Sequence, residues 1–103
     1  MSRRFVVGIS NASEAQITAL REHFQNQGSW WNWIPNFWLV ITTNHTTPIQ
    51  IREQIKRIAP GAQHMVIDAK DDGASDTWTG WGPNVAPRDM FEWMRSSWKN
   101  YSG

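Results

Sequence analysis

Tryptophan is the residue type in this sequence with the clearest chemical potential, because its indole ring can stack on planar ligands or fill protein interfaces. The 103 residues include eight tryptophans, which are Trp30, Trp31, Trp33, Trp38, Trp78, Trp81, Trp93 and Trp98. Each ring can bury about 150–250 Å² of surface, so a small two-layer domain with one open sheet face should not bury all eight. The surplus predicts a stacking platform for nucleobases or an interface between subunits, where tryptophan is enriched.

Two tryptophans and two cations are the expected ligand contacts. Trp78 and Trp81 lie in a glycine-bearing segment that packing does not obviously require, so we expect these rings to reach a ligand. Arg52 and Lys56 lie one turn apart on a predicted helix and are the expected phosphate contacts, which would make binding sensitive to salt. An ordinary solvated helix surface is the alternative interpretation of the two cations.

Catalysis has weak support in the sequence. Four aspartates lie around a predicted strand end and could offer oxygen ligands to Mg²⁺; they are Asp68, Asp71, Asp72 and Asp76. An EF-hand loop beginning at Asp68 fails, because Lys70 and Thr79 occupy its third and twelfth positions, and a solvated acidic loop is favoured. The histidines share no metal-ligand spacing, and no nucleophile elbow or phosphate-binding glycine loop is present. We therefore expect no catalytic residue, no metal site and no cofactor.

Composition narrows the class of protein further. Ten basic residues against nine acidic ones leave a net charge of +1, so binding to nucleic acid would need a local patch of charge. Cysteine is absent, which excludes disulfides and thiolate chemistry. No signal peptide is recognisable and no apolar run approaches the roughly 20 residues that span a bilayer. We expect a cytoplasmic protein with no membrane partner.

The elements that must position these side chains begin with a strand and a helix. Phe5–Ile9 is a short apolar run, partly β-branched, and predicts a buried strand. Ser13 and Gln16 have the spacing of a capping box, and Asn11 and Glu14 offer the same spacing two residues earlier. Gly28 is suited to end the helix that follows. The apolar spacing in this helix predicts one buried face, formed by Ile17, Leu20 and Phe24.

A hairpin is predicted around Pro35-Asn36, with strands at Trp30–Ile34 and Phe37–Thr42. Proline excludes a type I′ turn at this position, so we expect a type I turn with a slightly longer loop. Trp33 and Trp38 should then lie close across the hairpin on one face, with Trp31 and Val40 beside them. The expected interface between subunits is formed by Trp31, Trp33 and Trp38.

The second helix has the clearest start signals, with Thr47 as N-cap, Pro48 in the first position and Gln50 completing a capping box. Its buried stripe is predicted to be Ile51, Ile55 and Ile58. A strand at Met65–Ala69 follows, and Pro87 is expected to open a short last helix whose inward residues are Met90, Phe91, Met94 and Trp98.

The resulting order, βαββαβ, predicts an α+β, ferredoxin-like sandwich with an antiparallel sheet and helices on one face. We expect one domain over residues 1–103, with a core at 5–69 and a tryptophan-rich C-terminal extension at 70–103 that carries the short helix.

Several motifs of this sequence together resemble those of a known protein family. The run Gly28–Trp31 (GSWW), then Phe37–Val40 (FWLV), a threonine-capped helix and the later Glu92–Met94 (EWM) resemble the small SinR-like proteins, which are relatives of the dimeric subunit of the CRISPR adaptation complex. The resemblance implies a ferredoxin-like fold, a homodimer, and a role in the conflict between phage and bacterial host. In nuclease-like relatives an aspartate ends the first strand and binds metal, whereas here Gly8–Asn11 (GISN) has no carboxylate. The resemblance therefore implies binding without cleavage.

The sequence as a whole predicts a non-catalytic, dimeric module that recognises nucleic acid or a nucleotide-like ligand through exposed tryptophans. One alternative is a protein-interaction or inhibitor module that acts through its tryptophan-rich surface. A second alternative is a divalent-metal nuclease that uses the aspartates of the acidic loop.

Overall fold

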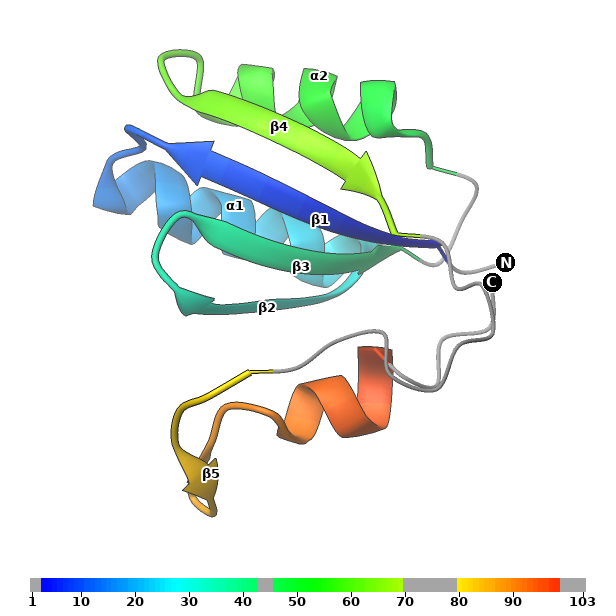
Figure 1. Cartoon of the computed structure of the whole chain (residues 1–103). Coiled ribbons are helices and arrows are strands. Elements are labelled where there is room, and N and C mark those ends of the chain that lie inside the picture. The colour runs from blue at the N-terminus through cyan, green and yellow to red at the C-terminus, as the bar shows by residue number, and fades with distance from the viewer. Residues whose placement is uncertain (1–2, 43–45, 70–79, 99–103) are drawn as a thin grey trace.

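The structure, a computed structural model, describes residues 3–42, 46–69 and 80–98. Its main elements are β1 (Arg3–Ser10), α1 (Glu14–Gln27), β2 (Gly28–Ile34), β3 (Phe37–Thr42), α2 (Pro48–Ile58) and β4 (Gln63–Asp68). These four strands form one antiparallel sheet in the order β2-β3-β1-β4, and both helices lie on one of its faces (Figure 1). The predicted α+β class with an antiparallel sheet is confirmed.

Both helices begin where the capping signals predict. The Gln16 backbone N–H donates to the Ser13 hydroxyl at 3.2 Å, and the Gln16 side chain accepts from the Ser13 N–H at 2.9 Å. Thr47 and Gln50 make the same pair of bonds at 3.2 and 2.8 Å, with Pro48 opening α2. Each box satisfies N–H groups that a helix start otherwise leaves without a partner. Gly28 is the C-cap of α1, as predicted.

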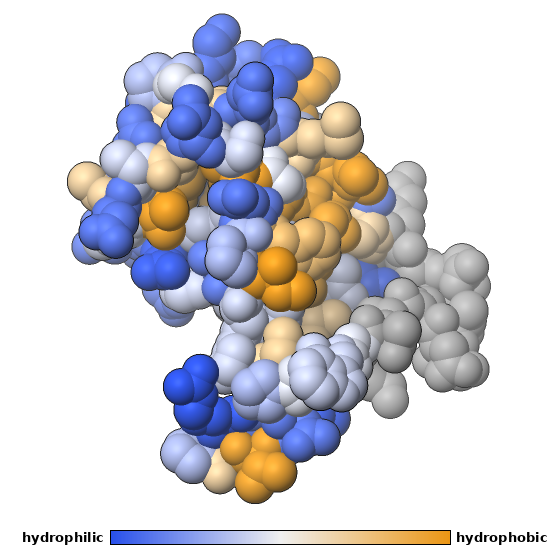
Figure 2. Space-filling view, turned by 60° about the vertical axis from the view of Figure 1, so that its left-hand side comes forward, coloured by the Kyte–Doolittle hydropathy of each residue, from blue (hydrophilic) through white to orange (hydrophobic). Residues whose placement is uncertain are grey.

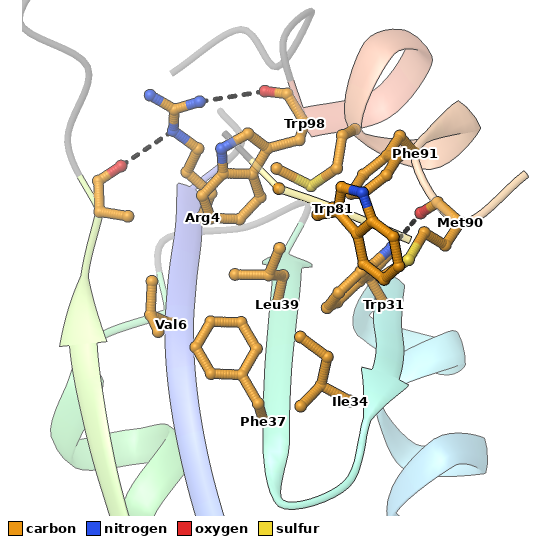
Figure 3. Close-up of a pocket in the computed structure, with 13 residues that line it drawn as sticks. Arg4, Val6, Trp31, Ile34, Phe37, Leu39, Trp81, Met90, Phe91 and Trp98 are labelled. Carbon is orange, nitrogen blue, oxygen red and sulfur yellow. Dashed lines mark hydrogen bonds between the residues drawn. The ribbon is translucent and has the colours of Figure 1, made fainter. Parts of the chain in front are cut away.

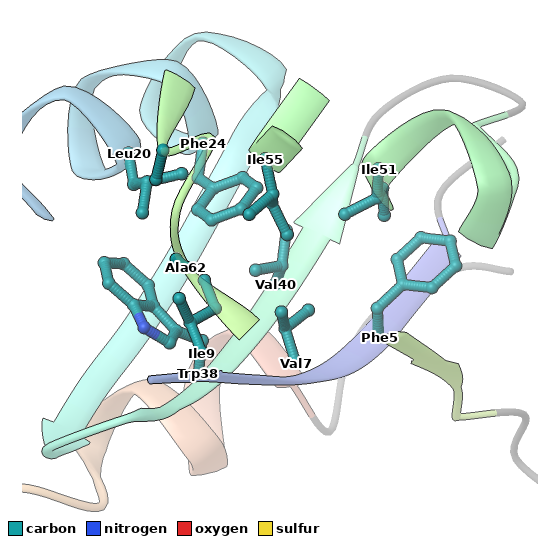
Figure 4. Packing of buried hydrophobic residues seen from close by; sticks show 11 residues of the cluster. Phe5, Val7, Ile9, Leu20, Phe24, Trp38, Val40, Ile51, Ile55 and Ala62 are labelled. Atoms are coloured by element: carbon teal, nitrogen blue, oxygen red, sulfur yellow. The ribbon is translucent and has the colours of Figure 1, made fainter. Parts of the chain in front are cut away.

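The main hydrophobic core lies between the sheet and the two helices (Figure 4). Alternate residues of each strand face it, since side chains along a strand point to opposite sides in turn. The helices add the stripes predicted from their spacing, with Ile17 and Ile58 only partly buried at the margin. The side chains that are at most 2% exposed include Phe5, Val7, Leu20, Phe24, Trp38, Val40, Ile51 and Ile55.

The hairpin corrects the predicted faces of its tryptophans. Trp38 and Val40 face the helices, whereas Trp31 packs on the opposite face of the sheet. The cause is a register shift in β2: Trp31 pairs with Leu39, but Ile34 pairs with Phe37. Such a bulge reverses the alternation of faces, so counting residues from the turn assigns Trp31 to the wrong side.

The turn of the hairpin also differs from the prediction. Ile34 pairs directly with Phe37, so Pro35 and Asn36 alone connect the strands, and Asn36 has a φ of 66°. A positive φ at the second central residue belongs to a type II turn, for which proline and then asparagine are suitable residues. The predicted type I turn with a longer loop is wrong.

The C-terminal segment, residues 80–98, forms the two-stranded ladder of β5 (Asn84–Val85) and β6 (Arg88–Asp89), then a short π-helix at Met94–Trp98. The prediction that Pro87 opens a helix is wrong, because Val85 pairs with Arg88 and so places Pro87 in the turn of this ladder. The helical residues follow Asp89, whose side chain accepts from the Phe91 N–H at 3.0 Å. The inward positions of Met90, Met94 and Trp98 are confirmed, since each is at most 6% exposed. The division into a core and an extension at residues 70–103 stays a prediction.

Candidate functional site

The face of the sheet opposite the helices is only partly covered. Figure 2 shows the C-terminal segment as a lobe that projects from the body of the chain, with apolar side chains on the body near the place where the two meet. The lobe packs on apolar residues of the three strands β1, β2 and β3. The buried members of this second cluster are Trp31, Leu39 and Ile41 from the sheet, with Met90, Met94 and Trp98 from the segment.

Hydrogen bonds hold the C-terminal segment on the sheet at Met90, Trp93 and Trp98. The Trp31 indole N–H donates to the Met90 carbonyl at 2.6 Å. The Arg4 guanidinium, which is buried, donates to the Trp98 carbonyl at 3.1 Å and to the Ala69 carbonyl at 2.9 Å. Its carbon Cζ also lies 4.8 Å from the Trp98 ring centroid, within cation–π range. A second indole N–H, that of Trp93, donates to the Ser29 hydroxyl at 3.1 Å.

An apolar pocket of about 340 Å³ remains between the segment and the open face (Figure 3). We call it the Trp81 pocket. Its floor includes Trp31 and Phe37, whose rings meet edge to face with centroids 6.2 Å apart. A volume of this size suits one small-molecule group. The lining is formed by Arg4, Val6, Trp31, Ile34, Phe37, Leu39, Ala69, Gly80, Trp81, Met90, Phe91, Met94 and Trp98.

Trp81 lies on the side of the pocket that the C-terminal segment forms, and its ring is 95% exposed. The glycines on either side explain how it is held. A Cβ atom at Gly80 would lie 2.6 Å from the Phe91 ring, and one at Gly82 would lie 2.0 Å from the Met90 sulfur. The backbone therefore lies against Phe91 and Met90 at a distance where any larger residue would have to displace one of these side chains. The Gly-Trp-Gly motif presents one large aromatic ring to solvent beside an apolar hollow.

The lining of the Trp81 pocket is mainly apolar. Arg4 is the only charged side chain of its described lining, and its guanidinium already donates to two backbone carbonyls. The rest of the lining is aromatic, aliphatic or thioether. A planar aromatic group fits these walls, and a charged group attached to it would remain in the solvent at the mouth.

The predicted ligand contacts do not come together in one site. Trp81 lines the pocket on the open face, whereas Arg52 and Lys56 lie on α2, which covers the other face. Arg52 forms an exposed ion pair with Glu53 at 2.8 Å, and this hydrogen bond from Arg52 lowers the pKa of Glu53. Phosphates of a ligand held by Trp81 are therefore out of reach of both cations. Trp78 lies outside the described residues.

The three tryptophans predicted at a subunit interface have different environments. Trp31 is 4% exposed beneath the C-terminal segment, and Trp38 is 2% exposed in the helix-side core. Both rings are buried by packing within the chain, so neither can contribute surface to an interface between subunits. This corrects the prediction for these two residues. Trp33, at 41% exposure, is the only one of the three at the surface.

The acidic cluster is only partly described. Asp68 forms an ion pair with Arg3, while Asp71, Asp72 and Asp76 lie outside the described residues. Within residues 3–42, 46–69 and 80–98, no three acidic or histidine side chains are grouped so as to hold a metal ion. The same ranges contain no helix that is long and apolar enough to cross a membrane.

Sequence reasoning missed most of the pocket. No pattern in the sequence indicates that the side chain of Arg4 is buried against a residue 94 positions later. The sequence places Phe37 in a predicted strand and does not indicate that it belongs to a binding site. The one signal that pointed to the site was glycine on both sides of Trp81.

Comparisons of this chain with protein-family models, with curated proteins and with solved structures gave no match.

Proposed function

We propose that this chain is a non-catalytic binding module that holds a planar, nucleobase-like group of a nucleic acid or nucleotide at the Trp81 pocket. The observation that carries the proposal is a ring of 95% exposure beside an apolar pocket of about 340 Å³. Leaving an indole in water is unfavourable, and a stacked base would remove part of that surface from solvent. Every base has a π-face, so such stacking tolerates different sequences.

The walls of the pocket support an aromatic group over an aliphatic chain. Phe37, at 37% exposure, offers its ring on the sheet side, where the buried Trp31 packs edge to face against it, and Trp81 offers a ring on the segment side. A base that enters between them is contacted on both faces. Its sugar and phosphate remain in the solvent at the mouth, and Arg4, the one charged side chain of the described lining, keeps its two backbone partners.

We also infer a ferredoxin-like arrangement for the sheet and its helices. The element order βαββαβ and the strand order β2-β3-β1-β4, with both helices on one face, support it. The resemblance to SinR-like proteins and the cytoplasmic location stay predictions.

Replacing Trp81 with alanine is expected to weaken binding of a fluorescein-labelled oligothymidylate at low salt by at least about fivefold, because one stacked base contributes about 1–3 kcal/mol. Trp81→Phe keeps an aromatic face and should retain most of the affinity. Fluorescence anisotropy titration measures both. Val85→Ala is the matched control, since Val85 is a 74% exposed apolar residue of the same segment outside the pocket lining. Equal affinities for Trp81→Ala and Val85→Ala would remove Trp81 from the site.

Self-association is the second candidate function, and a specific feature of β4 favours it. Met65 and Ile67 are 68% and 52% exposed on the open face, in register with Gly8 and Val6 of β1. They extend the apolar surface of the pocket across the sheet. A second copy of the chain could cover such a self-complementary strip, as expected for a two-fold dimer.

The double substitution Met65→Lys and Ile67→Lys should convert a dimer into a monomer, because each lysine would place a charge in an apolar interface. Light scattering after size-exclusion chromatography measures the mass of each protein. Ile49→Lys is the control, since Ile49 is a 63% exposed apolar residue on the helix side. A wild-type protein that is monomeric at about millimolar concentration would contradict this candidate.

A further inference from the structure

The outer edge of the sheet at β2 carries arginine and tryptophan side chains together. β2 is an end strand, and among the described residues no strand pairs with its outer side. The guanidinium carbon of Arg21, on α1, lies 5.6 Å from the Trp30 ring centroid, and that of Arg88, on β6, lies 6.0 Å from the Trp33 ring centroid. Both distances are within cation–π range. Elements that are far apart in the sequence therefore bring two cations to neighbouring rings.

Asn32 holds this edge in place. Arg21 donates to the Asn32 side-chain oxygen at 3.4 Å. The Asn32 side-chain amide donates in turn to the carbonyls of Ile34 and Phe37, at 3.1 and 2.9 Å. These bonds bridge the bulged end of β2 and orient the Arg21 guanidinium. We call this region the β2 edge surface, and its members are Arg21, Trp30, Asn32, Trp33 and Arg88.

The β2 edge surface is hollowed rather than flat. One groove is lined by Arg21, Trp30, Trp31, Asn32, Trp33 and Trp93. A second groove lies between α1 and the hairpin turn, and it shares Arg21, Asn32 and Trp33 with the first. Trp33 stands between them at 41% exposure, and both arginines are exposed. Rings for stacking and cations for phosphates therefore lie together along one accessible edge.

We propose that the β2 edge surface binds the chain of a single-stranded nucleic acid, which deepens the proposed function by naming its ligand class and in this respect rests on it. Trp31 lines both the Trp81 pocket and the first groove, so a strand with one base in the pocket can continue along the edge. Base faces are accessible for stacking in a single strand and are covered by neighbouring bases in a duplex. Guanidinium groups suit this task because they stack on aromatic rings and also bind phosphate oxygens.

The test uses the full chain and a labelled oligothymidylate of about 12 nucleotides, a length within the range that single-strand sites occupy. Anisotropy is measured over a series of KCl concentrations for the wild type and for the double variant Arg21→Gln and Arg88→Gln. Each lost phosphate contact should reduce the slope of log affinity against log salt by about 0.7, so the double variant should lose about 1.4. The gain in affinity on a tenfold dilution of salt then falls about fivefold for each arginine.

Two further variants separate charge from stacking. Arg21→Lys with Arg88→Lys keeps the charge and should keep the slope. Trp33→Leu should leave the slope unchanged and lower the affinity at every salt concentration by at least about fivefold. Arg57→Gln, at an exposed arginine of α2 on the other side of the sheet, is the control for the loss of one positive charge away from the β2 edge surface. Circular dichroism verifies that each variant is folded.

The outcomes distinguish this inference from the proposed function. If the double glutamine variant has the slope of Arg57→Gln, the inference is wrong, even where Trp81→Ala still weakens binding. If Trp81→Ala binds like the wild type while the double variant loses its slope, the edge binds nucleic acid and the Trp81 proposal fails. A duplex or an acidic peptide of equal charge that competes as well as unlabelled oligothymidylate would also overturn the assignment to a single strand.

Discussion

Replacing Trp38 with alanine should lower the free energy of unfolding by about 3–5 kcal/mol, as expected for a large aromatic side chain removed from a close-packed core. Trp38 is 2% exposed, and its ring meets Phe24 at a centroid distance of 5.6 Å and Trp30 at 5.8 Å. The substitution removes both aromatic contacts and leaves a cavity between α1 and the sheet. Small domains are stable by only about 5–15 kcal/mol in total, so this loss is large.

Chemical denaturation followed by far-ultraviolet circular dichroism measures this effect. Trp33→Ala is the matched control because it removes the same side chain from the same hairpin at a surface position, and it should cost at most about 1 kcal/mol. The assignment of Trp38 to the core and Trp33 to the surface predicts a clear difference between the two. Similar midpoints for both variants would contradict the burial of Trp38 and the exposure of Trp33.

The second large effect is expected at Arg4. Arg4→Met keeps much of the length and apolar character of the side chain but removes the donors to the Trp98 and Ala69 carbonyls. Hydrogen bonds from charged groups contribute about 1.5–3 kcal/mol each, and buried carbonyls without donors are costly. We expect the C-terminal segment to lose about 2–4 kcal/mol of its stability on the sheet, with a smaller effect on the helix-side core.

Amide hydrogen exchange locates this change. In Arg4→Met the amides of residues 90–98 should exchange faster, while those of β1 and β3 should keep their protection. Because the segment forms one wall of the Trp81 pocket, binding of the oligothymidylate should weaken as well. Arg57→Met, on the exposed side of α2, should change neither property. Unaltered exchange across residues 90–98 would mean that Arg4 does not hold the segment.

The helices and strands could be predicted from the sequence because their signals are local. Ser13 with Gln16, and Thr47 with Gln50, lie three residues apart, and the hydrogen bonds that they make have the same span. The isoleucines of α2 repeat at helical spacing and share one neighbour, the sheet. Such patterns are decided within one or two turns of chain, so no knowledge of distant residues is needed.

The site could not be predicted in the same way, because distant residues decide it. Arg4 and Trp98 meet across 94 positions, and neither has a sequence neighbour that indicates the contact. The face of Trp31 depends on a single extra residue in β2, which the alternation rule does not detect. The predicted grouping of Trp81 with Arg52 and Lys56 failed to form one site because helix and pocket occupy opposite faces of the sheet, a relation that spacing does not encode.

The indole N–H resonance of Trp81 in a nitrogen–proton correlation spectrum gives the most direct test of the central claim. Trp81→Phe identifies the resonance by its disappearance, and the buried Trp38 serves as an internal reference within the same spectrum. On titration with unlabelled oligothymidylate at low salt, the Trp81 resonance should be among the indole resonances that shift or broaden most. The Trp38 resonance should stay in place. A Trp81 resonance that remains unchanged at saturating oligothymidylate would show that the pocket does not hold a base.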